Sequence, residues 1–135
     1  MNLFKLGKFK SHSGLELDWK VECDALLIED WDWAAKMVAS QTKFGSVIGV
    51  PSGGLKFAKA LEKYTTFGQT IIVDDVLTAG ASILKLMKEN KSSLGWVLFS
   101  RDHDLIGYRH GYGEIRAIWT LNAKSLGMKN IDIYR

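Results

Sequence analysis

The chain has 135 residues, of which 47% are hydrophobic and 24% charged, and its formal net charge is +3 at pH 7. This length suits a single domain with a real core, and no apolar run is long enough to span a membrane. The positive charge suits an anionic ligand, but it is too mild and too evenly spread to argue for a nucleic acid partner.

Residues 1–5 lack the long apolar segment and the small-residue cleavage site of a signal peptide. Cys23 is the single cysteine of the chain, so an internal disulfide is impossible. Both features predict a cytoplasmic protein in which Cys23 is a small, buried, apolar residue.

The first predicted elements are two possible strands within residues 3–20, joined by a turn at 11–14. A helix over 24–41 follows, with Asp24 as its cap. Its buried face is predicted to carry residues at helical spacing, namely Leu27, Trp31, Ala34 and Val38. Trp31 and Trp33 fit core and flanking positions, with a base-stacking platform as the alternative.

Strands predicted over 46–50, 71–73, 95–100 and 114–121 alternate with helices over 55–64 and 83–89. This alternation is typical of a parallel α/β sheet covered on both faces. The remaining predictions are a polar loop at 101–113, a short helix or turn at 122–128 and a last strand at 131–134.

The most informative stretch, residues 70–82, has the sequence T-I-I-V-D-D-V-L-T-A-G-A-S. A buried strand is followed by two carboxylates, Asp74 and Asp75, and then by small residues that open a helix. Such a loop lets backbone N–H groups approach a phosphate, and the helix N-terminus adds a favourable dipole. The carboxylates suit the hydroxyls of the attached sugar. The stretch predicts a ribose 5-phosphate site, with an ordinary capped turn as the alternative.

This stretch resembles the ribose-phosphate signature of type I phosphoribosyltransferases, enzymes that use 5-phosphoribosyl 1-diphosphate (PRPP). Its D-D-V-x-T-A-G form looks most like that of orotate phosphoribosyltransferases. The resemblance covers about residues 6–121. It implies an α/β fold, with an open parallel sheet, helices on both faces and a small N-terminal hood. Here the hood is residues 1–22 and the core is 23–135.

The resemblance also implies a function, namely transfer of ribose 5-phosphate from PRPP to a nucleobase, with orotate as the best match. Mg²⁺ is the implied cofactor, carried by PRPP and not by a protein metal site, and a homodimer is the implied assembly. The implied catalytic residues are Asp74 and Asp75. The implied ribose-phosphate residues are Asp74, Asp75, Thr78, Ala79, Gly80, Ala81 and Ser82.

A second strand-to-helix turn resembles the loop that holds the diphosphate of PRPP in this family. A glycine turn of this kind before a helix is also an anion site on physical grounds. In some orotate enzymes a lysine occupies the place of Gly53. The implied diphosphate-binding residues are Pro51, Ser52, Gly53 and Gly54.

Two segments resemble parts of the family that bind the base. Residues 9–14 look like the segment that covers the base, and His12 falls where bacterial orotate enzymes often carry a lysine. Residues 98–101 resemble the strand whose arginine pairs with the orotate carboxylate, an interaction that a guanidinium makes bidentately. Arg101, Thr78 and His12 are therefore the predicted base-binding residues. The alternatives are a solvated turn for His12 and a solvated strand end for Arg101.

The run Asp102-His103-Asp104 contains potential metal ligands but lacks clear ligand geometry, so we predict no protein metal site there. His110 is predicted to be solvated.

The chain departs from the family in two places. It lacks the N-terminal helix, and residues 64–68 replace a segment that carries a mobile catalytic loop in relatives. One possible replacement is the loop 107–113, which contains Arg109 and His110. The missing loop leaves two alternatives to a complete enzyme. One is a regulatory module that binds PRPP or a nucleotide without catalysis, and the other is a subunit that needs cations from a partner chain.

Overall fold

The computed structural model describes residues 4–10, 16–78, 80–101, 103–109 and 111–120. None of the helices among these residues is long and apolar enough to cross a membrane. The helices and strands, in chain order, are β1 (Phe4–Lys10), β2 (Glu16–Val21), α1 (Ile28–Gln41), β3 (Ser46–Gly49), α2 (Leu55–Glu62), β4 (Thr70–Leu77), α3 (Ala81–Glu89), β5 (Leu94–Ser100), β6 (Gly107–Arg109) and β7 (Gly113–Thr120).

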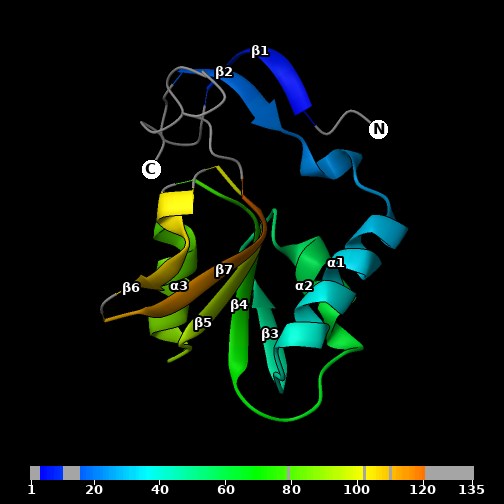
Figure 1. Ribbon diagram of the computed structural model, residues 1–135, viewed down its shortest axis with the longest axis vertical. Helices are drawn as coiled ribbons and strands as arrows, with labels where there is room; N and C mark the ends of the chain where they lie inside the picture. Colours follow the sequence, from blue (N-terminus) through cyan, green and yellow to red (C-terminus); the bar gives the residue numbers. More distant parts are fainter. Residues whose placement is uncertain (1–3, 11–15, 79, 102, 110, 121–135) are drawn as a thin grey trace.

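The main sheet has five strands in the order β3-β4-β5-β7-β6. Strands β3, β4, β5 and β7 are parallel, and the edge strand β6 is antiparallel to β7. The antiparallel pair β1–β2 forms a separate sheet, which lies beyond the carboxyl ends of the parallel strands (Figure 1). The predicted α/β architecture is therefore confirmed.

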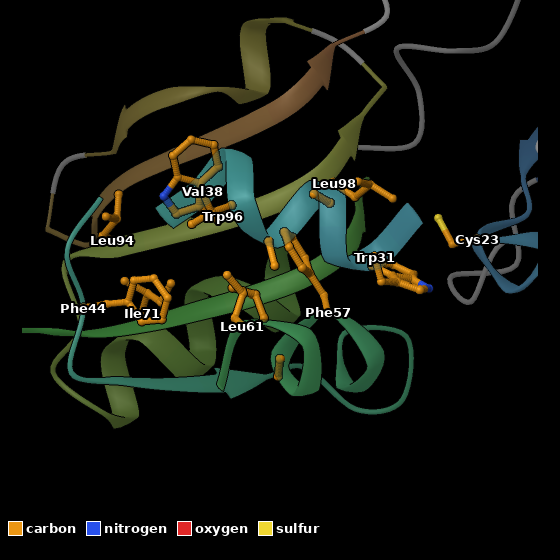
Figure 2. Packing of buried hydrophobic residues seen from close by; sticks show 14 residues of the cluster. Cys23, Trp31, Val38, Phe44, Phe57, Leu61, Ile71, Leu94, Trp96 and Leu98 are labelled. Atoms are coloured by element: carbon orange, nitrogen blue, oxygen red, sulfur yellow. The ribbon is translucent and has the colours of Figure 1, made fainter. Parts of the chain in front are cut away.

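Helices cover both faces of the main sheet, as predicted (Figure 1). On one face, α1 and α2 pack against β4 and β5 through a cluster that includes Trp31, Phe57, Ile71 and Trp96 (Figure 2). On the other face, α3 contributes Ile83 and Met87 to a second cluster with neighbouring strands. Burial on both faces explains why β4 and β5 contain nearly continuous apolar runs.

The two candidate base-stacking tryptophans have different environments. Trp31 is 4% exposed and packs against Phe57, with ring centroids 5.6 Å apart. Trp33 is 45% exposed and stacks on Trp119 at 5.3 Å, with an angle of 18° between the rings. The core position is thus confirmed for Trp31 and the flanking position for Trp33. Cys23 is buried and free, as predicted.

The predicted start of the first helix is wrong. Asp24 lies in a short 3-10 helix, Cys23–Ala25, and α1 begins only at Ile28. The carboxylate that serves this terminus belongs to Asp30, which accepts a hydrogen bond from the Leu27 N–H at 2.8 Å. Leu27 therefore precedes the helix and is 63% exposed, instead of facing the core.

Other boundaries also differ from the predictions. Strand β4 extends to Leu77, so Asp74 and Asp75 belong to the strand and do not follow it. Helix α3 begins at Ala81, earlier than predicted. The predicted loop at 101–113 contains strand β6, because glycines with positive φ at 111 and 113 turn the chain back onto β7. The elements predicted at 122–128 and 131–134 lie outside the described residues.

One buried hydrogen bond is expected to contribute measurably to stability. Trp96 Nε1 donates to Thr42 Oγ1 at 3.1 Å, between the central strand β5 and the end of α1. Thr42→Val keeps the shape but leaves the indole N–H unpaired in the core, which costs about 1–3 kcal/mol. Urea denaturation measures the loss. Thr65→Val, which removes an exposed hydrogen bond to the Glu62 carbonyl, is the control. Equal stability of the Thr42 variant and the wild type would contradict the expectation.

Candidate functional site

The two predicted carboxylates lie near the carboxyl end of β4, between β3 and β5. Both are half-buried. Asp74 Oδ1 accepts a hydrogen bond from the Asp75 N–H at 2.8 Å, and Asp75 Oδ1 accepts one from the Val76 N–H at 2.7 Å. Each side chain is therefore oriented by the backbone N–H of the next residue.

Asp74 is an unusual acid. Burial, reinforced by hydrogen bonding to Asp75 and by the charge of that neighbour, raises the pKa of Asp74 to about 8. Two carboxylates at adjacent positions cannot both ionise without repulsion, so one proton is held by the pair near neutral pH. A cationic or hydroxyl-bearing ligand would relieve that repulsion.

The raised pKa of Asp74 predicts how the stability of the protein changes with pH. The folded-state pKa of about 8 exceeds the ordinary value of 3.8, so the folded protein binds the proton more tightly than the unfolded chain. The resulting stability is fully present below about pH 4 and is lost as the pH rises through about 8. Asp74→Asn is therefore expected to raise Tm at about pH 9 by at least about 4 °C, equivalent to about 1 kcal/mol.

Thermal melts between about pH 5 and pH 9 check this expectation. Asp24→Asn is the control, because the Asp24 carboxylate is 84% exposed. Parallel pH profiles for wild type and Asp74→Asn would contradict a raised pKa in the folded state.

The second predicted motif packs directly against the first. Gly53 faces Asp75 so closely that a Cβ on Gly53 would collide with the Asp75 carboxylate. The turn is held by hydrogen bonds from Val50 N–H to the Val73 carbonyl and from Gly54 N–H to the Val50 carbonyl, both 2.8 Å long. Pro51 and Ser52 are exposed, and the peptide bond that joins them is cis.

Gly54 is the most tightly enclosed residue of this turn. A Cβ there would lie 2.5 Å from the Val73 carbonyl oxygen and 2.7 Å from the Val50 nitrogen. These are backbone atoms, so they cannot move away as a flexible side chain does. The close packing brings the turn at 51–54 against β4, although the two motifs are 20 residues apart in sequence.

The predicted phosphate loop lies at the start of α3. Gly80 is the N-cap residue, with φ +86°, and its lack of a side chain leaves the cap without a side-chain hydrogen bond. The first N–H groups of a helix have no intrahelical partner, so this terminus offers donors to an anion. Thr78 is half-buried, Ala81 and Ser82 are exposed, and Ala79 lies outside the described residues.

The predicted base-binding residues are only partly described. Arg101 follows β5 directly, and its N–H donates to the Leu77 carbonyl at 3.4 Å, which joins the ends of β4 and β5. Its side chain is 4% exposed, so the alternative of a solvated strand end is wrong. Thr78 lies just past the same end of β4. His12 lies outside the described residues, so its role stays a prediction.

The side chain of Arg109 lies close to the predicted phosphate loop, a position that the sequence did not predict. Arg109, in β6, directs its guanidinium to the phosphate loop: a Cβ on Gly80 would lie 3.8 Å from Arg109 Nη1. The sequence pointed to Arg109 only as part of the loop 107–113, a possible replacement for the missing catalytic loop. No local pattern indicates its neighbour, because the contact depends on how β6 folds back onto β7.

A hollow of about 380 Å³ on the outer surface of α1 and α2 is not the site. It is lined by residues of α1 and by Lys63, which directly follows α2, and its charged groups already form a network. Asp32 contacts Lys63 at 2.5 Å, Lys36 at 3.3 Å and the Tyr64 hydroxyl at 2.8 Å. Hydrogen bonds from Lys63 and Tyr64 lower the pKa of Asp32 to about 2. This cluster ties α1 to α2.

Sequence comparison identifies no relative, since neither a protein-family model nor a curated protein matches the chain. Comparison with solved structures identifies proteins of similar fold. The orotate phosphoribosyltransferase of Aeropyrum pernix aligns with a TM-score of 0.66 and 20% sequence identity, covering 93% of this chain and 94% of that chain.

Two other structures agree with this result. The orotate phosphoribosyltransferase of Mycobacterium tuberculosis H37Rv, in complex with Fe(III) dicitrate, gives a TM-score of 0.65 at 13% identity and covers 87% of this chain and 89% of that chain. The UMP synthase of Leishmania donovani gives 0.67 at 17% identity and covers 89% of this chain and 34% of that chain. The chain therefore has the fold expected from its resemblance to type I phosphoribosyltransferases.

Proposed function

We propose that this chain, which has the fold of the orotate phosphoribosyltransferases, transfers the ribose 5-phosphate group of PRPP to a nucleobase, with orotate as the preferred base. One observation carries the proposal: the turn at Gly53 packs against the Asp75 carboxylate at the end of β4. Two strand-to-helix turns and two carboxylates thereby share the edge of the sheet where α/β proteins bind ligands. Two anion-binding turns lie on either side of two carboxylates that can accept hydrogen bonds from sugar hydroxyls. This arrangement matches a sugar that is phosphorylated at both ends.

Each part of PRPP has proposed partners. The turn Pro51-Ser52-Gly53-Gly54 holds the diphosphate, and Asp74 and Asp75 accept hydrogen bonds from the ribose hydroxyls. The 5-phosphate lies at the start of α3, against Thr78, Ala79, Gly80, Ala81 and Ser82. Arg101, Thr78 and His12 orient the base. Because the Arg101 side chain is almost fully buried, a carboxylate that pairs with it is withdrawn from water, which strengthens the ion pair.

In the proposed reaction, a ring nitrogen of the base forms a bond to C1 of the ribose while the bond from C1 to diphosphate breaks. The bonding electrons leave with diphosphate, and the proton of the attacking nitrogen passes to solvent. Positive charge develops on the sugar ring in the transition state. The negative charge of the Asp74–Asp75 pair, which shares one proton near neutral pH, stabilises that positive charge, and the fixed orientation of the pair means that little reorganisation is needed.

Mg²⁺ is the proposed cofactor. Among the described residues, no group of three or more His, Cys, Asp or Glu side chains is arranged to hold a metal. Mg²⁺ usually keeps several waters and binds through one or two carboxylates together with substrate phosphates. In the proposed complex Mg²⁺ is carried by PRPP, and when bound it would neutralise charge on the leaving diphosphate.

A second candidate function is a regulatory module that binds PRPP or a nucleotide without catalysis. The observation that favours it is the short connection between α2, which ends at Glu62, and β4, which begins at Thr70. The resemblance places a mobile catalytic loop of the family in this connection. Without that loop, the site binds its ligand but excludes less water from the reacting atoms.

One assay separates the two candidates. Purified protein is incubated with PRPP, Mg²⁺ and one base at a time, and base consumption and diphosphate release are measured together. Equal amounts of orotate consumed and diphosphate released support the transferase, and uracil, adenine and hypoxanthine test the choice of base. PRPP binding without diphosphate release from any base would support the regulatory module. Activity that appears only after addition of cell extract would point to a partner chain that supplies the missing cations.

A homodimer in the cytoplasm is part of the same proposal. The single free cysteine fits a reducing compartment, and the dimer is implied by the resemblance. Light scattering after size-exclusion chromatography measures the assembly directly. A monomer that turns over PRPP would remove the dimer from the proposal without affecting the chemistry.

A further inference from the structure

Large apolar side chains lie exposed around the beginning of α1. Leu27 and Ile28 stand at the start of the helix, and Ile28 is 86% exposed. Trp33 is exposed further along the helix, where it stacks on the exposed Trp119 of β7 with ring centroids 5.3 Å apart. These four residues are called the α1 patch below. A cluster of exposed apolar side chains of this kind marks an interaction surface.

The hollow of about 380 Å³ on α1 lies directly beside the most exposed of these side chains. Ile28 and Trp33 form its apolar wall, and the remaining lining residues are charged. Leu27 and Ile28 therefore project from the same surface that carries the hollow. The Trp33 ring is already held by its stack on Trp119, so little conformational freedom is lost when another molecule packs against it.

The rim of the hollow carries charges of both signs. Lys36 and Lys63 pair with Asp32, and both lysine side chains are still largely exposed. Glu29 lines the same hollow and makes no ion pair within the part of the chain that the structure describes. An exposed carboxylate thus lies beside two exposed ammonium groups.

This combination has the property that a symmetric dimer requires. In a twofold dimer the same patch is used by both copies, so the patch must contain both halves of every contact. Here an apolar projection lies beside a hollow, and a carboxylate lies beside lysines. A foreign partner would need only one half of each contact on this chain. The presence of both halves therefore favours a second copy as the occupant.

We propose that the α1 patch is the interface of a symmetric homodimer, in which Leu27 and Ile28 of each copy enter the hollow of the other copy. Glu29 then pairs at the rim with Lys36 of the other copy. The inference goes beyond the proposed function, which names a homodimer only by resemblance and assigns no interface. None of the proposed PRPP-binding or base-binding residues belongs to this patch, so assembly and chemistry can be tested separately.

Ile28→Glu in the full-length chain tests the interface. Because the Ile28 side chain is exposed, we expect the thermal stability of the monomer to stay unchanged. In the dimer the new carboxylate would be buried without a partner at two symmetric places, so we expect the Kd of the dimer to rise by at least about 100-fold. Light scattering after size-exclusion chromatography, over a series of protein concentrations, measures this Kd.

Phe67→Glu is the matched control. Phe67 is also exposed, but it contacts Lys43, just past the C-terminal end of α1, so its replacement is expected to leave the Kd of the dimer unchanged. A charge exchange adds a second test. Glu29→Lys is expected to weaken the dimer about tenfold by placing like charges opposite each other, and the further change Lys36→Glu is expected to restore it. Recovery would support direct contact between the two copies.

A wild-type chain that stays monomeric at every concentration would overturn the inference. The occupant of the patch would then be residues 121–135, which follow it in sequence, or a different protein. A dimer that survives Ile28→Glu, or that Phe67→Glu dissociates equally, would also overturn it. Orotate consumption and diphosphate release are measured on the same samples. Activity in a monomeric wild type would leave the proposed function intact, whereas an inactive wild-type dimer would count against the proposed function alone.

Discussion

The double variant Asp74→Asn, Asp75→Asn is expected to lower kcat/KM for PRPP by about 10³-fold without loss of thermal stability. Each carboxylate is proposed to accept a hydrogen bond from a ribose hydroxyl, and hydrogen bonds to charged groups contribute roughly 1.5–3 kcal/mol each. Losing two of them accounts for a change of this size. The carboxylates also stabilise the cationic sugar in the transition state, so kcat falls as well as affinity.

The fold is expected to tolerate both substitutions. The hydrogen bonds that the structure assigns to these side chains, from Asp75 N–H and Val76 N–H, go to one oxygen each, and an asparagine carbonyl accepts them equally well. The substitution also removes the cost of burying Asp74, the same cost that raises its pKa. Stability and activity are therefore predicted to change in opposite directions.

Diphosphate release and orotate consumption measure the activity, and thermal melts at about pH 8 measure the fold. Asp24→Asn serves again as the control for the loss of one carboxylate, since the Asp24 side chain is 84% exposed. Turnover within about tenfold of wild type would show that the pair does not hold the sugar. If the double variant loses activity because it unfolds, the single variants Asp74→Asn and Asp75→Asn, which each keep one carboxylate, test the role of the pair.

Gly54→Ala is expected to destabilise the protein by about 3 kcal/mol, the upper part of the usual range for overpacking. The new methyl group would lie 2.5 Å from the Val73 carbonyl oxygen, and the surrounding atoms belong to the backbones of β4 and of Val50. Relief therefore requires separation of the turn from β4, which breaks the hydrogen bond from Val50 N–H to Val73.

Gly53→Ala makes a useful comparison, because it introduces the same methyl group one residue earlier. There the obstacle is the Asp75 carboxylate, a side chain that is able to rotate. We expect a stability loss of only about 1 kcal/mol but a loss of activity of about tenfold or more, since the carboxylate leaves its aligned position. Ser52→Ala, at an exposed position of the same turn, controls for stability.

Chemical denaturation and PRPP kinetics on the three variants distinguish these effects. We expect Gly54→Ala to lower mainly the free energy of unfolding. We expect Gly53→Ala to lower mainly the activity with PRPP. Wild-type stability together with wild-type PRPP kinetics in Gly53→Ala would show that the contact between the turn and Asp75 has no functional consequence.

Much of the fold was predictable because local patterns and burial agree along most of the chain. The apolar runs of β4 and β5 are buried on both faces, and their sequences show this directly. The helical spacing of Trp31, Ala34 and Val38 likewise identifies the buried face of α1. The errors fall at element ends, where one hydrogen bond decides the outcome. The sequence analysis named Asp24 as the cap, whereas in the structure Asp30 accepts a hydrogen bond from the Leu27 N–H.

The sequence by itself determined the order of the helices and parallel strands, the two glycine turns and the adjacent carboxylates, because each depends on residues that are neighbours in the chain. Tertiary structure alone decided which of these groups meet. The contact of Gly53 with Asp75 arises because β3 and β4 are parallel neighbours whose carboxyl ends share one edge. The burial of Arg101 and the approach of Arg109 to Gly80 depend on sheet order and on the return of β6. No local pattern encodes such distances, since they result from packing the whole chain around one core.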